Sequence, residues 1–87
     1  MITIEQIEAI EQIERAKREA MKDVFGVKYV PCVSLGEHGK NALLEVAAKL
    51  DLKVERIDGI DYNAYQLWHD GVLWGATAKR AYAGEVE

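Results

Sequence analysis

The fold is decided by residues 27–57, VKYVPCVSLGEHGKNALLEVAAKLDLKVERI. Apolar residues stand at every second position from Val27 to Leu35, which predicts a strand with one buried face. From Lys40 to Leu50 the apolar spacing changes to three and four, which predicts a helix. Leu52 to Ile57 is predicted to be a short second strand. A strand, a helix and a strand in so short a stretch predict a parallel crossover.

Pro31 and Cys32 lie in the first predicted strand. Proline has no backbone N–H, so this strand is expected at an edge of the sheet, or interrupted at Pro31. We expect Cys32 to be packed as a small hydrophobe rather than exposed as a nucleophile. His38 and His69 are too few and too isolated to predict a metal site, and both are expected on solvated turns.

The chain before residue 27 is predicted to be a helix from Ile4 to Phe25. Thr3 and Gln6 fit a capping box at its start, and Gly26 suits its end. The C-terminal half is expected to dock on the domain, and Ile4 and Ile7 to point partly elsewhere, toward a loop, a second copy or a partner. The predicted docking face is Ala9, Ile10, Ile13, Ala16, Ala20, Met21 and Val24.

Residues 64–77 are predicted to form a hairpin. Asp70 and Gly71 supply the two positive-φ positions of a tight two-residue turn. That register pairs Leu67 with Trp74 on one side and Trp68 with Leu73 on the other, whereas a three-residue loop would slip the register and swap the partners. Both tryptophans are buried if helices cover both faces of the sheet, and one is exposed if they do not. Residues 78–83 are predicted either as a short C-terminal helix or as more of the last strand.

Composition limits the class of protein. The chain has 87 residues and 49% hydrophobic residues, which predicts one domain spanning residues 1–87. Its net charge is −4 without a basic stripe, which argues against direct binding to nucleic acid. The single cysteine and the lack of a long apolar stretch predict a cytoplasmic protein that does not enter a membrane.

The turn between the first strand and the helix resembles a phosphate-binding loop in its layout. The pattern G-x-x-x-x-G-K-[ST] requires glycine where this chain has Ser34, and a hydroxyl where it has Asn41. Nucleotide hydrolysis is therefore not expected. A weaker alternative is an anion site at the start of the helix, formed by Gly39, Lys40 and Asn41.

The expected architecture is α+β, with a long N-terminal helix and a second helix packed on a small mixed sheet of three or four strands. The element order is α-β-α-β-β-β. The sequence contains no nucleophile with its base, no metal-ligand cluster and no cofactor fingerprint. We therefore expect a protein that is not an enzyme and uses no cofactor or metal.

The leading hypothesis is a small acidic regulator or inhibitor that binds another protein with a basic surface, as some phage- or mobile-element-encoded proteins do. If that partner binds nucleic acid, the acids would compete with phosphates. The alternatives are a binding module for a small anion at Gly36–Asn41 and a structural homo-oligomer, such as a homodimer through the N-terminal helix. The predicted partner-binding residues are Trp68, Leu73, Asp58, Asp61, Tyr62, Glu55, Ile4 and Ile7.

Overall fold

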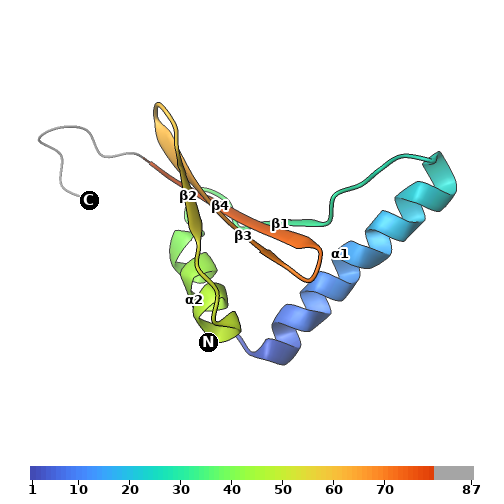
Figure 1. Cartoon of the computed structure of the whole chain (residues 1–87), viewed down its shortest axis with the longest axis horizontal. Coiled ribbons are helices and arrows are strands. Elements are labelled where there is room, and N and C mark those ends of the chain that lie inside the picture. Colours follow the sequence, from blue (N-terminus) through green and yellow to red (C-terminus); the bar gives the residue numbers. More distant parts are fainter. Residues whose placement is uncertain (80–87) are drawn as a thin grey trace, which may run out of the picture.

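The structure, a computed structural model, describes residues 1–79. Helices and strands follow in the predicted order α-β-α-β-β-β, and the fold is α+β (Figure 1). The elements are α1 (Ile4–Phe25), β1 (Cys32–Ser34), α2 (Lys40–Leu50), β2 (Glu55–Asp58), β3 (Tyr62–His69) and β4 (Val72–Lys79). Of the segment predicted as either a short helix or more of the last strand, Ala78 and Lys79 belong to β4, and residues 80–83 lie outside the described residues.

The sheet is mixed, with the strand order β1-β4-β3-β2. β1 runs parallel to β4, while β4 with β3 and β3 with β2 are antiparallel. β1 and β2 therefore point the same way, as a parallel crossover requires. They are not neighbours, however, because the β3–β4 hairpin lies between them and α2 connects the two outer strands.

Helix α1 begins and ends where its caps predict. The Thr3 side chain accepts a hydrogen bond from the Gln6 backbone, and the Gln6 side chain accepts one from the Thr3 backbone. Gly26 ends the helix in the left-handed conformation, with φ of 66°, and its N–H donates to the Lys22 carbonyl. These bonds satisfy backbone groups that a helix end leaves unpaired.

The face of α1 that docks is not the predicted one. Ile7 and Glu11 are fully buried, whereas Ile13 and Val24 are exposed. Figure 1 shows the C-terminal half of α1 projecting beyond the sheet, while its first half lies near α2. The prediction that Ile7 points away from the domain, toward a loop, a second copy or a partner, was therefore wrong. The prediction failed because it excluded acidic side chains from the interior, and Glu11 has partners there.

Both predicted strands of the crossover are shorter in the structure. β1 begins at Cys32, directly after Pro31, and residues 27–30 are not part of the sheet. These residues instead line a groove with the C-terminal half of α1. Pro31 still accepts a hydrogen bond from Leu73 of β4 through its carbonyl, and β1 is an edge strand, as its proline predicts. β2 begins at Glu55 because Leu52 still bonds back to α2.

The hairpin has the register of the two-residue loop, with Leu67 opposite Trp74 and Trp68 opposite Leu73. Asp70 and Gly71 form its turn, with φ of 51° and 76°. One face of the sheet packs against both helices, which lie on the same side of it in Figure 1. The core consists of Ile7, Leu43, Val46, Ala47, Leu67, Val72, Trp74 and Ala76.

In the described part of the chain, neither helix has the length and apolar character needed to cross a membrane.

Candidate functional site

The face of the sheet that points away from the helices is covered by no described element. Side chains alternate between the two faces of a strand, so the strand register identifies the residues of this face. We call it the open face. Its residues are Cys32, Ser34, Glu55, Ile57, Tyr62, Ala64, Gln66, Trp68, Leu73, Gly75, Thr77 and Lys79.

Trp68 is the largest side chain of the open face. It is 54% exposed, whereas Trp74 on the other face is 1% exposed. The two-residue turn puts Trp68 opposite Leu73, and the parallel pairing puts Leu73 opposite Cys32. These three residues form an apolar row across three strands at one end of the face. The sequence left open which tryptophan is exposed. The answer depends on which face of the sheet the helices cover, and here both helices cover the face that carries Trp74.

A shallow hollow lies beside this row, at the middle of the open face. Its volume is about 220 Å³, and its lining includes Ser34, Gln66, Gly75 and Thr77. Gly75 leaves the backbone of β4 uncovered, since the nearest heavy atom to an added Cβ would be 3.8 Å away. The open face therefore combines a projecting indole with a depression that a partner side chain could enter.

The predicted acidic residues lie along β2 and the turn after it. Glu55 is exposed on the open face, opposite Gln66. Asp58 is also exposed, but its carboxylate is 2.9 Å from the guanidinium of Arg56, which offsets its charge. Asp61 lies in the β2–β3 turn. The structure thus brings Glu55 to the open face but places Asp58 and Asp61 toward the other end of the strands from Trp68.

Tyr62, also at that end, is held by the turn after β1. Its hydroxyl donates to the Glu37 carboxylate at 3.1 Å. This bond and the negative charge of Glu37 raise the pKa of Tyr62 above its ordinary value. Tyr62 is partly exposed at the end of β3, away from Trp68.

The two isoleucines predicted to contact a partner lie on α1, which packs on the opposite face of the sheet. Ile4 is about half exposed. Ile7 is fully buried in the core, so it offers no surface to a partner. The structure therefore does not bring either residue to the open face.

The residues of the alternative anion site have structural contacts. The Gly39 N–H donates to the Gly36 carbonyl at 3.3 Å. Gly39 is buried, and a Cβ there would overlap the side chain and carbonyl of Leu35. The Lys40 ammonium lies 4.9 Å from the centre of the Tyr65 ring, a cation–π contact. Asn41, the third residue predicted there, is exposed in the first turn of α2.

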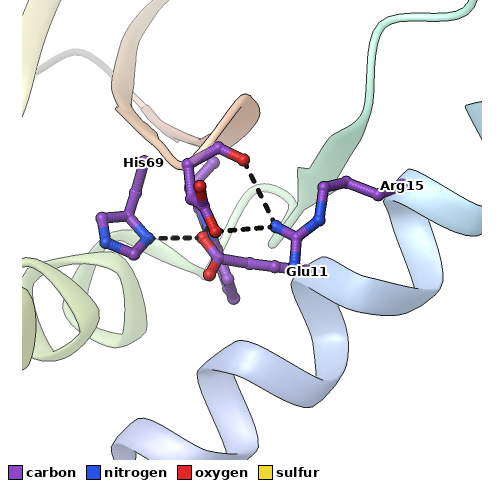
Figure 2. A network of polar contacts seen from close by, with 5 residues as sticks. Glu11, Arg15 and His69 are labelled. Carbon is purple, nitrogen blue, oxygen red and sulfur yellow. Dashed lines mark hydrogen bonds and ion pairs between the residues drawn. The ribbon is translucent and has the colours of Figure 1, made fainter.

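A polar cluster that the sequence did not predict joins α1 to the hairpin (Figure 2). One carboxylate oxygen of Glu11 accepts from Trp74 Nε1 at 3.1 Å and lies 2.8 Å from Nδ1 of His69. One helical turn later, Arg15 bonds Asp70 at 3.2 Å. His69 is therefore not a solvated turn residue. The sequence feature that could have predicted this cluster is the four-residue spacing of Ile7, Glu11 and Arg15, which places them on one side of a helix.

Glu14, the next buried acid of α1, lies beside the outer edge of β1 and covers it. It accepts from Lys17 Nζ at 2.9 Å, from the Tyr29 hydroxyl at 3.0 Å, and from the backbone N–H of Cys32. The bond from Lys17 is the main cause that holds the pKa of Glu14 below its ordinary value. Tyr29 has a raised pKa, first because its hydroxyl bonds Glu14.

Cys32 is exposed on the open face, so the prediction that it is packed was wrong. Within residues 1–79, no three His, Cys, Asp or Glu side chains gather as metal ligands would.

Comparison with known proteins adds no relative. No protein-family model matches the chain, and no curated protein or solved structure is significantly similar to it.

Proposed function

We propose that this chain is a small acidic regulator that binds another protein through the open face of its sheet, with Trp68 as the anchor. The observation that carries the proposal is the 54% exposure of this indole on a sheet face that no described element covers. Tryptophan is among the residues that contribute most to binding when a partner buries them. Leaving it in water costs burial energy that a partner would recover.

The neighbours of Trp68 suit an interface. Leu73 lies directly opposite it and extends the apolar surface. The hollow over Gly75 lies next to this surface, and its mostly apolar lining includes the polar side chains of Ser34 and Gln66. Interfaces commonly combine an apolar centre with a polar rim. An inserted side chain of the partner would fill the hollow while the indole is covered.

The partner's chemistry follows from charge. The chain carries −4, and the open face itself holds an exposed acid, Glu55, and an exposed base, Lys79, opposite Tyr62. A basic rim on the partner would complement the negative net charge and speed association. If that basic surface binds nucleic acid, the acidic chain would compete with phosphates and act as an inhibitor. Asp58 contributes less to this, because Arg56 is paired with it. We propose that this takes place in the cytoplasm, where a lone cysteine stays reduced.

The test is affinity capture from the native host, followed by calorimetric titration of the purified partner. Trp68→Ala is expected to weaken binding by about 2 kcal/mol, or roughly 30-fold. Ile13→Ala is the matched control, because Ile13 is 58% exposed but lies on α1. Glu55→Gln should reduce the salt dependence of the association rate.

Two results would contradict the proposal. One is a partner that binds Trp68→Ala and the unchanged chain with equal affinity. The other is a partner whose binding is lost on Ile13→Ala instead, since that would place the interface on α1.

A further inference from the structure

The two edges of the sheet are protected differently. At β1, Pro31 has no N–H to offer, and the N–H of Cys32 is donated to the buried carboxylate of Glu14. At the other edge, all four residues of β2 are exposed, and no element within residues 1–79 covers them. An open strand edge carries unpaired backbone groups and is a template for another strand.

The hydrogen-bond pattern shows which backbone groups of β2 point outward. The N–H of Leu73 bonds Pro31, and the carbonyl of Gly75 bonds Leu35, so the odd-numbered residues of β4 face β1. In an antiparallel ladder, alternate residues of a strand bond opposite neighbours. The even-numbered residues of β4 therefore bond β3, and the even-numbered residues of β3 bond β2. In the observed register, those residues of β3 lie opposite Glu55 and Ile57, so Glu55 and Ile57 bond β3. The backbone N–H and C=O groups of Arg56 and Asp58 therefore point outward, away from the sheet.

We propose that β2 pairs antiparallel with β2 of a second copy of this chain, with the two-fold axis at Ile57. In this register, Arg56 of each copy lies opposite Asp58 of the other. Those are the residues with outward backbone groups, so each pair can exchange both hydrogen bonds of an antiparallel ladder. Their side chains, which pair within each copy at 2.9 Å, can exchange partners to form an ion pair across the interface at both ends, and the two Ile57 side chains meet on the opposite, open face of the sheet.

Charge selects this register over its neighbours. An axis at Arg56 would put Arg56 opposite its own copy, and an axis at Asp58 would do the same for Asp58. Like charges directly opposite each other destabilise a strand pair, whereas opposite charges stabilise it. Ile57 is 47% exposed, so its self-contact also removes apolar surface from water.

The product is a continuous sheet of two four-stranded halves, with both open faces on the same side. The pairing involves short strands, and interfaces at the small end of the known range are weak. The dimer is therefore expected to form reversibly with rising concentration. This inference does not depend on the proposed function, because it needs no other protein.

The test is sedimentation equilibrium of the full chain from about 10 µM to about 1 mM, a range suited to a weak interface. The unchanged chain is expected to shift from one copy to two. Arg56→Asp and Asp58→Arg should each raise the dissociation constant roughly tenfold or more, because like charges then face each other. An equimolar mixture of the two variants should form a heterodimer, since its ion pairs are complementary.

The double variant Arg56→Asp with Asp58→Arg is the control for folding, and it should dimerise like the unchanged chain. Amide exchange gives a second measurement, in which Arg56 and Asp58 become protected as concentration rises. A single-copy mass at every concentration would overturn the proposal. So would charge variants that dimerise normally, or amides of Arg56 and Asp58 that are equally protected at all concentrations.

Discussion

The indole Nε1 of Trp74 donates to the Glu11 carboxylate at 3.1 Å, which ties α1 to the centre of β4 inside the core. The same oxygen contacts Nδ1 of His69, at the end of β3. Its companion, Oε1 of Glu11, is buried without a hydrogen-bond partner among residues 1–79. A buried carboxylate is costly unless its bonds are good, so this contact positions α1 at the expense of some stability.

Glu11→Ala is expected to lower the free energy of unfolding by about 2–4 kcal/mol, because it leaves the buried Trp74 N–H without an acceptor and opens a cavity. Glu11→Gln keeps an acceptor and should cost less. Urea unfolding followed by circular dichroism measures both, with the exposed Glu8→Ala as the control. A Glu11→Ala variant as stable as Glu8→Ala would contradict this role.

The two tryptophans should respond oppositely to truncation. Trp74→Ala removes a core side chain and is expected to cost about 3–5 kcal/mol, enough to unfold so small a domain. Trp68→Ala should change stability by less than about 1 kcal/mol, because its indole is already half in water. Quenching of tryptophan fluorescence by iodide is an independent measurement of exposure. The part of the fluorescence that iodide can quench should disappear in Trp68→Ala. Persistent quenching in that variant would place Trp74 in solvent.

Gly39→Ala is expected to destabilise the chain more than Gly71→Ala does. At Gly39, the added Cβ would overlap backbone and side-chain atoms of Leu35, and a rigid carbonyl cannot give way. At Gly71 the added Cβ meets open space, so the cost is that of a positive φ, about 1 kcal/mol. Thermal unfolding of the two variants decides the order, and equal midpoints would show that the turn before α2 relaxes freely.

Glu14 should contribute stability that is lost in acid. Its pKa is lowered in the folded chain, chiefly by the bond from Lys17, so the folded state releases the proton more readily than the unfolded state. The contribution is complete above the unfolded pKa and disappears as the pH falls through the folded one. The stability difference between the unchanged chain and Glu14→Gln should therefore shrink from about pH 7 to about pH 3. A constant difference across that range would refute the linkage.

Local signals predicted much of this fold. The capping box at Thr3 and the glycine at 26 locate α1, and Asp70-Gly71 determines the register of the hairpin down to each cross-strand pair. Such features depend on residues close in sequence. The predicted strand from Val27 was too long because its true extent depends on contacts with residues far away in the sequence. Its alternation continues through Pro31, but residues 27–30 line a groove beside α1 instead of pairing with β4, and Val27 and Val30 are exposed.

The candidate site was less predictable, because it depends on which face the helices cover. Trp68 and Trp74 have similar local surroundings in sequence, and their different burial follows from α1 and α2 packing on one side. The burial of Glu11 is likewise a tertiary effect. Helical periodicity identifies the apolar face of a helix. It cannot show that the Glu11 carboxylate has hydrogen-bond partners in Trp74 and His69, which lie far away in the sequence.

The parallel pairing of β1 with β4 has a consequence for synthesis on the ribosome. Cys32 is made well before its neighbour in the sheet, Leu73, which belongs to β4. Until β4 emerges, α1 and α2 have no finished surface to pack on, so the nascent chain stays open to proteases until then. Contacts this distant in sequence also slow folding. A chain cut within β4 should therefore lose both helices along with the missing strand.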